Sequence, residues 1–160
     1  MILQKRKVFI FSRPFIGVFF LLMFSVFSHS ANAQNKKNET PQLTRIEFLF
    51  DASQSMYGRW QSGAKIDVAK MLMKQLLDSL RYVNNLEIAL RVYGHQKNFP
   101  PQDCDDSKLE VPFSKGNISA IQQVLKDVIP RGTTPIAKSL ELCGNDFPQS
   151  PSRNIIILIT

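Results

Sequence analysis

The sequence predicts an α/β fold, in which strands alternate with helices along the chain. Three short apolar runs, at residues 43–50, 86–93 and 154–159, have the length of strands. Between them, apolar side chains recur at helical spacing over residues 65–81 and 117–129. This alternation is typical of a three-layer domain, in which a mainly parallel sheet carries helices on both faces.

The first 33 residues have the pattern of a secretory signal peptide. A basic segment precedes an apolar run over residues 15–27, and Ala31-Asn32-Ala33 predicts cleavage before Gln34. The alternative is an uncleaved anchor, but the run is shorter than the ~20 residues that a spanning helix needs. We expect an exported protein, periplasmic or extracellular, with no stable membrane span after cleavage. Polar residues 34–42 then form a flexible leader.

Charge and motifs exclude several classes of function. Four of the 20 basic residues lie in the signal segment, and the remaining ones are scattered, so a nucleic-acid interface is not expected. No phosphate-binding P-loop or G-x-G-x-x-G motif is present. Gln54-Ser55-Met56 is not the nucleophile elbow of a hydrolase, and Ser53 stands where an aspartyl phosphotransferase needs a second Asp. We therefore expect a protein that is not an enzyme.

The first strand, at residues 43–50, ends in a nearly continuous apolar run, as a central parallel strand does. Asp51, Ser53 and Ser55 follow it at the carboxyl end, where open α/β sheets place ligand sites. One carboxylate and two hydroxyls suit a hard divalent cation such as Mg²⁺ or Mn²⁺. The alternative is a tight turn in which these side chains hydrogen-bond only to the nearby backbone.

A second loop with a hydroxyl precedes the next helix. Gly132 permits a tight turn, and Pro135 suits the first turn of a helix expected from about residue 136 to 142. Thr134 would then cap that helix through its side chain.

The D-x-S-x-S of residues 51–55 and the Gly132-Thr133-Thr134 turn, in this order, resemble the two halves of a known site. They are similar to the metal-ion-dependent adhesion site of von Willebrand factor type A (VWA) domains, which have a Rossmann-like fold. The resemblance implies that Asp51, Ser53, Ser55 and Thr134 hold Mg²⁺ or Mn²⁺, with Ca²⁺ as an alternative. It also implies that an Asp or Glu of a partner protein completes the coordination, so the function would be binding.

The apolar run at residues 154–159 predicts a third buried strand, which is followed by Thr160, the last residue. In VWA domains this strand leads into T-D-G, whose Asp is the second carboxylate of the metal site. The resemblance therefore implies that residues 43–160 form a partial VWA domain, incomplete at the C-terminus, with a weakened site. The alternative function is a sensor or regulatory domain of a larger exported or envelope protein, with the metal site inactive in this fragment.

The second strand and the loop after it have mixed character. Residues 86–93 alternate between apolar and other side chains, which predicts a less buried face or a position near the sheet edge. His95, at its end, is expected to make structural hydrogen bonds. The acidic cluster of Asp103, Asp105 and Asp106 is expected to be solvated, and Pro112 restricts residues 109–113 to an edge strand.

Several single residues have structural expectations. Trp60 is expected to be a partly buried packing residue, with a place at the rim of a ligand face as the alternative. Met71 and Met73 are expected to fill the core, and Asn117 or Ser119 to cap the helix at residues 117–129. Export would place Cys104 and Cys143 in an oxidising compartment. A disulfide between them and free thiols remain equal alternatives.

Overall fold

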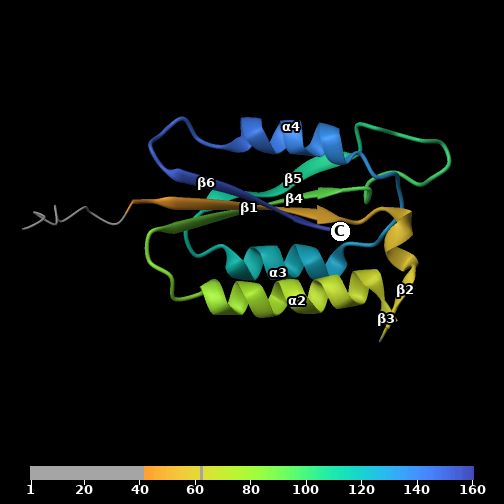
Figure 1. Cartoon of the computed structure of the whole chain (residues 1–160), viewed down its shortest axis with the longest axis horizontal. Coiled ribbons are helices and arrows are strands. Elements are labelled where there is room, and N and C mark those ends of the chain that lie inside the picture. Colours follow the sequence, from red (N-terminus) through yellow and green to blue (C-terminus); the bar gives the residue numbers. More distant parts are fainter. Residues whose placement is uncertain (1–41, 62) are drawn as a thin grey trace, which may run out of the picture. The chain divides into compact units, whose positions relative to one another are not determined.

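A computed structural model describes residues 42–61 and 63–160, so the signal peptide predicted over residues 1–33 lies outside the described residues. Its main sheet has four strands in the order β5-β4-β1-β6 (Figure 1). They are β1 (Thr44–Asp51), β4 (Leu86–Tyr93), β5 (Ser107–Ser114) and β6 (Arg153–Ile159). β1 pairs in parallel with β4 and β6, and only β5 is antiparallel. The mainly parallel sheet and the edge position of the strand with Pro112 are thus confirmed.

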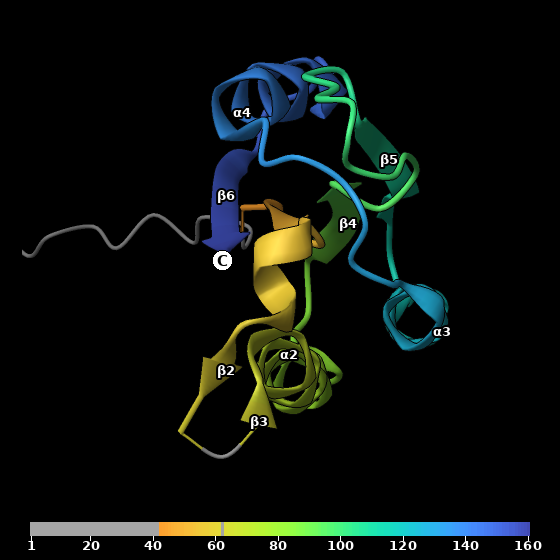
Figure 2. The same ribbon diagram turned by 90° about the vertical axis from the view of Figure 1, so that its right-hand side faces the viewer.

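Helices cover both faces of this sheet, as the sequence predicted. Seen from the side to which the parallel strands point, α4 lies on one face and α2 and α3 lie on the other (Figure 2). The helices are α2 (Lys65–Leu80), α3 (Ile118–Asp127) and α4 (Ile136–Asp146). After β1 come a short 3-10 helix, η1 (Gln54–Tyr57), and the small antiparallel pair β2 (Arg59–Trp60) and β3 (Gly63–Ala64). No helix in the described ranges has the length and apolarity to cross a membrane.

The face under α2 and α3 forms the larger hydrophobic core. Phe48, Phe50, Leu90 and Val92 of the central strands are fully buried there, and they belong to one cluster with apolar residues of both helices. Burying each such side chain contributes about 1.5–3 kcal/mol relative to leaving it in water. This core fixes the two central strands, and with them the carboxyl edge where the candidate site lies.

The opposite face, under α4, is buried and carries charged side chains among apolar ones. The parallel register places Glu47 beside Ala89, Leu49 beside Arg91, and Asp51 beside Tyr93. The prediction that β4 has a less buried face is wrong, because α4 covers its polar side. The alternative, a position nearer the edge, agrees with the strand order, in which only β5 lies beyond β4. The polar side chains alternate along β4 because they pair with charges inside the protein.

The helix ends differ from the capping predictions. Asn117 precedes α3 but makes no capping bond; its Nδ2 instead donates to the carbonyls of Ile88 (2.7 Å) and Pro112 (3.0 Å). This side chain therefore ties the start of α3 to the sheet. At α4 the N-cap residue is Pro135, no side chain caps the helix, and the helix continues to Asp146, past the predicted end at residue 142.

Three expectations about burial are also corrected. Trp60 is 54% exposed, and Met71 lies on the outer side of α2, whereas Met73 is buried as predicted. β6 was expected to be a buried strand, but it lies at the sheet edge with Ile156 partly exposed. Both cysteines are free rather than joined in a disulfide, with Cys104 exposed and Cys143 buried.

Candidate metal centre

Asp51 is the last residue of β1 and lies buried at the carboxyl edge of the sheet. Its Oδ1 accepts a hydrogen bond from the backbone N–H of Ser53 (2.8 Å), and its Oδ2 accepts one from the hydroxyl of Thr160 at the end of β6 (2.7 Å). Both oxygens keep further lone pairs. The carboxylate is therefore held in one orientation while it can still accept another ligand.

The two serine hydroxyls of the motif lie together next to this carboxylate. The Oγ atoms of Ser53 and Ser55 are 2.9 Å apart, with Ser53 buried and Ser55 exposed on η1. The bond from the Ser53 N–H to Asp51 is the local turn that the sequence offered as the alternative to a metal site. The turn uses backbone N–H groups and leaves the oxygens facing the same edge, so the turn and a metal site are compatible.

The loop at residues 131–134 lies alongside the motif. Ser53 and Gly132 form a parallel β-bridge, the Gln54 N–H donates to the Gly132 carbonyl (2.9 Å), and the Arg131 N–H donates to the Ala52 carbonyl (3.1 Å). The fold thus brings together the two segments that the sequence singled out, although they are far apart along the chain.

Gly94, at the end of β4, allows this close approach. Its φ is +74°, and a Cβ added there would lie 2.6 Å from the Thr133 carbonyl oxygen and 2.7 Å from the Ser53 backbone nitrogen. Its carbonyl accepts the N–H groups of Arg131 (3.0 Å) and Gly132 (2.8 Å). Only glycine fits a position with this φ and this packing.

Thr134, the fourth predicted ligand, is exposed and lies just after the bridge. Its hydroxyl has no hydrogen-bond partner among the residues that the structure describes, and it does not cap α4. The capping role is therefore not observed. The structure shows no contact between Thr134 and Asp51, so only their two loops are in contact.

Tyr93 is a site residue that the sequence reasoning missed. It pairs with Asp51 in the parallel register and is fully buried, and its hydroxyl lies beside Asp51 and Thr160 without an ordinary hydrogen bond to a described residue. Burial and the negative charge of Asp51 raise the pKa of Tyr93. Only knowledge of the strand register would have placed this side chain next to the motif.

One member of the acidic cluster on the β4–β5 loop, Asp106, is structural rather than solvated, whereas Asp105 is exposed. Asp106 is 1% exposed and accepts hydrogen bonds from the backbone N–H groups of Gln96 and Lys97, both at 3.1 Å. Asp103 pairs with Lys97, and its carbonyl accepts the Thr133 hydroxyl. These contacts hold the β4–β5 loop against the 131–134 loop, so the expectation of a solvated cluster is wrong for Asp106.

His95 has the structural role that the sequence predicted. Its Nε2 lies 2.8 Å from Oε1 of Glu110, and Lys108 is also paired with this carboxylate. Burial alone would raise the pKa of Glu110, but the bonds from His95 and Lys108 lower it below its usual value. The imidazole therefore forms a hydrogen bond with Glu110 on the neighbouring strand β5.

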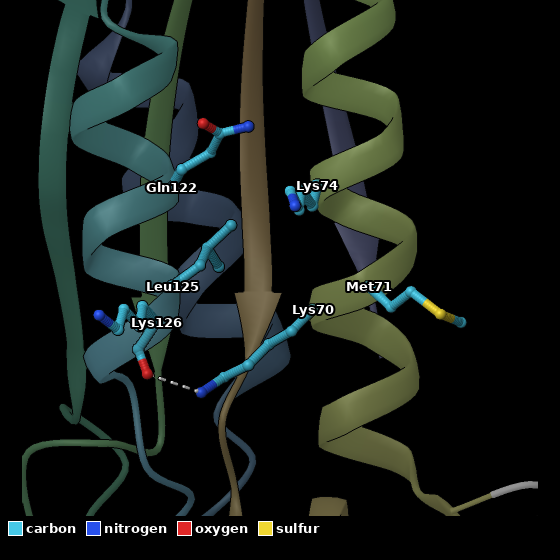
Figure 3. Close-up of a pocket in the computed structure, with 6 residues that line it drawn as sticks. All are labelled: Lys70, Met71, Lys74, Gln122, Leu125 and Lys126. Atoms are coloured by element: carbon cyan, nitrogen blue, oxygen red, sulfur yellow. Dashed lines mark hydrogen bonds between the residues drawn. The ribbon is translucent and has the colours of Figure 1, made fainter.

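A cavity of about 370 Å³ opens between α2 and α3 (Figure 3). The residues that line it are Lys70, Met71, Lys74, Gln122, Leu125 and Lys126. Lys70 reaches across it, and its Nζ donates to the carbonyls of Val128 (2.6 Å) and Lys126 (3.3 Å) at the end of α3. Burial lowers the pKa of Lys70. The lysine thus stabilises a helix end, which otherwise exposes unpaired carbonyls.

The donors at the sheet edge fit a hard cation. One carboxylate and neighbouring hydroxyls are oxygen ligands of the kind that Mg²⁺ and Mn²⁺ prefer. Over residues 42–61 and 63–160, no group of three or more His, Cys, Asp and Glu side chains could hold a metal ion. A site here therefore depends on its hydroxyl groups.

Comparisons with known proteins agree with this fold. The chain is 30% identical over 150 residues to the Bacillus subtilis protein YwmD, covering 90% of this chain and 64% of YwmD. An aerotolerance-related membrane protein of Bacteroides fragilis matches with a TM-score of 0.56 and 22% identity, over 72% of this chain and 52% of that one. The von Willebrand factor domain of the Porphyromonas gingivalis pilus tip protein Mfa5 matches with a TM-score of 0.54 and 21% identity. The match covers 73% of this chain and 37% of that one.

The family model for the von Willebrand factor type A domain matches residues 46–160. This range contains both loops that the sequence singled out and all strands of the main sheet except the start of β1. The chain therefore belongs to the von Willebrand factor type A domain family.

Proposed function

We propose that this protein is an exported protein-binding module that captures an acidic residue of its partner through a divalent cation, Mg²⁺ or Mn²⁺. Asp51, Ser53, Ser55 and Thr134 would hold the cation. The observation that carries the proposal is the meeting of two oxygen-bearing loops at the carboxyl edge of a parallel sheet. Ligand sites in open α/β folds occur at this edge.

The balance of charge at this edge favours an acidic partner. A single carboxylate would leave most of the charge of a divalent cation uncompensated, and the bound cation would offer an open coordination position to a carboxylate. Asp51 is oriented beforehand by the Ser53 N–H and the Thr160 hydroxyl. Ser55 and Thr134 are exposed, so they would face the partner.

Binding rather than catalysis is the activity that these residues support. Neither serine of the motif lies in a nucleophile elbow, and His95 is paired with Glu110, away from the motif. A catalytic base would have to lie within hydrogen-bond reach of a reacting group. We therefore assign the site no reaction.

The relatives favour a role outside the cytoplasm. Mfa5 is described as a pilus tip protein and the Bacteroides relative as a membrane protein, and the first 33 residues of this chain have the pattern of a secretory signal. The chain spans 64% of the length of YwmD. A sensor or regulatory role within a larger envelope protein is therefore the second candidate, and there the metal site would be inactive.

Calorimetric titration of the purified protein with MnCl₂ tests the proposed site. We expect saturable binding that Asp51→Asn abolishes, because this change removes the only carboxylate among the four ligands. Asp67→Asn is the matched control, since Asp67 is an exposed acid in the first turn of α2. Equal binding by wild type and Asp51→Asn would overturn the site, whereas a folded wild type that binds no cation would favour the second candidate.

The partner's chemistry can be probed with acetate, the simplest carboxylate. In the Mn²⁺-loaded protein we expect the acetate methyl resonance to broaden more than with the same concentration of Mn²⁺ alone. Asp51→Asn should remove the excess broadening. Absence of excess broadening in a wild type that binds Mn²⁺ would contradict the capture of a carboxylate and leave only the cation site.

A further inference from the structure

A buried charged cluster lies beneath α4, apart from the candidate metal centre. It consists of Glu47 on β1, Arg91 on β4, and Cys143 and Asp146 on α4, and we refer to it as the α4 cluster. Glu47 and Cys143 are 0% exposed and Arg91 is 6% exposed. Ionisable groups are rarely this buried unless they are paired.

The guanidinium of Arg91 is committed to Asp146. Its Nε and Nη2 donate to the two carboxylate oxygens of Asp146, at 2.7 and 2.9 Å. Such a bidentate pair is the strongest form of ion pair between side chains. Glu47 comes no closer to Arg91 than 3.7 Å, and neither of its oxygens has a hydrogen-bond partner among the described residues.

Two acids therefore share one base in the interior. If both were ionised, the α4 cluster would hold one uncompensated negative charge, and a buried charge without a hydrogen bond is strongly disfavoured. Asp146 has the better hydrogen bonds, because Arg91 donates to both of its carboxylate oxygens. Glu47 relieves the imbalance by binding a proton. Burial and the neighbouring Asp146 raise the pKa of Glu47 to about 8.

No other neighbour offers Glu47 a compensating charge. On β1, Arg45 is bound to Glu87 (2.8 Å) and to Ser152 (2.7 Å). On β4 the remaining ionisable group of this face is Tyr93, and β5 contributes Ser107, which lies 3.4 Å from Nη1 of Arg91. β6 places Ile156 beside Glu47. On α4, Cys143 and Asp146 face Glu47, and Glu47 itself helps to raise the pKa of the Cys143 thiol.

We propose that Glu47 keeps α4 packed on the sheet only as a neutral carboxylic acid, and that loss of its proton releases α4. The ionised carboxylate gains water only if the helix above it moves away. Because α4 begins directly after Thr134 and Pro135, its release also displaces the 131–134 loop that contacts the D-x-S-x-S segment. This last consequence for metal binding rests on the proposed function, whereas the release of α4 itself does not.

Cys143 is a built-in reporter for the release of α4, because it is fully buried on that helix. In a Cys104→Ser background it is the only thiol. We would measure its labelling by a thiol reagent between about pH 6 and pH 7, without metal, in that background and with Glu47→Gln added. Gln copies the shape of the neutral acid. Glu141→Gln is the matched control, because it makes the same change at an exposed position of α4.

The two variants should respond differently to pH. Thiolate formation alone raises the labelling rate about tenfold per pH unit, and proton-linked release of α4 multiplies this by about tenfold again. We therefore expect the labelling rate of Cys143 to rise about a hundredfold per pH unit in the Cys104→Ser background and in the Glu141→Gln control. With Glu47→Gln it should rise only about tenfold per pH unit. The same tenfold slope in all three proteins would overturn the proposal.

A second measurement covers the case in which Glu47→Gln does not fold. The carboxyl ¹³C resonance of Glu47 in the wild-type protein should titrate above pH 7 if Glu47 is neutral in the folded state. Titration near the ordinary glutamate pKa of about 4.5 would overturn the proposal. Mn²⁺ affinity measured at the same pH values then separates the release of α4 from the proposed metal site. If the protein binds no Mn²⁺, the expected labelling of Cys143 is unchanged.

Discussion

At the residue scale, the candidate site depends on a position with no side chain. Gly94 brings the 131–134 loop and the D-x-S-x-S segment together, and its positive φ and its contacts both exclude a Cβ. We predict that Gly94→Ala destabilises the protein by about 2–4 kcal/mol, because an overpacking cost adds to backbone strain. Urea denaturation checks the stability, and Mn²⁺ titration should show weaker binding.

Gly116 provides a control with matched backbone geometry. It has a similar φ of +71°, but a Cβ there would meet nothing within 4 Å. Gly116→Ala should cost only the strain of the left-handed backbone, about 1 kcal/mol. If Gly94→Ala and Gly116→Ala lower the free energy of unfolding equally, the close packing at Gly94 does not contribute to stability.

The residues at the edge differ in how far their sequence context reveals them. Asp51, Ser53 and Ser55 follow an apolar strand with a spacing that predicts a hard-cation site, and the resemblance to VWA domains adds Thr134. Tyr93 and Asp106 have no such local signal. Tyr93 joins the site through the register between β1 and β4, and Asp106 through a loop that folds back on Gly132. Contacts of this kind depend on tertiary structure, which no periodicity contains.

At the scale of elements, β4 shows how one pattern can have two physical causes. Alternation in a strand is usually caused by water on one face, but in β4 it is caused by a buried layer of ion pairs beneath α4. Local sequence cannot separate these causes, because a charged residue that meets water and one that meets a partner look the same. The helices α2 and α3 were predictable because their apolar stripes match the apolar face of the sheet.

The same layer gives a prediction for Arg91. Replacing it with Met leaves the partly buried Asp146 unpaired beside the fully buried Glu47, so we expect Arg91→Met to destabilise the protein by about 3–5 kcal/mol. Adding Asp146→Leu removes the uncompensated charge and should recover a large part of this loss. Urea denaturation of the single and double variants checks this. A double variant no more stable than Arg91→Met would mean that packing, rather than charge, accounts for the loss.

At the scale of the whole molecule, the fold class followed from the alternation of strands and helices, but the strand order did not. The order β5-β4-β1-β6 depends on which strands pair, and nothing in the apolar runs specifies their neighbours. Pro112 was informative because a residue without an N–H group is excluded from a central strand. It predicted an edge position for β5, and the structure agrees.

The stability of the whole molecule should depend on pH in a way that Glu47 dominates above pH 5. Its folded-state pKa of about 8 exceeds its unfolded value of about 4.5. Between these two values the folded state holds the extra proton, so the free energy of unfolding falls as the pH rises, by at most ~5 kcal/mol in total. Asp103 and Glu110 contribute to the pH dependence with the opposite sign. Because their pKa values are lowered in the folded state, they increase the free energy of unfolding as the pH rises through the acid range.

These opposing trends predict maximum stability in mildly acidic solution. Urea denaturation of the wild type from about pH 4 to pH 9 should therefore give a stability that rises at first and then falls. Glu47→Gln should keep the acid limb, which belongs to the other carboxyls, and lose the fall above pH 5. The variant would then be less pH-dependent than the wild type and more stable at pH 9. If stability falls by the same amount in both proteins above pH 5, the fall is caused by another group. Glu47 would then be ionised over this whole pH range.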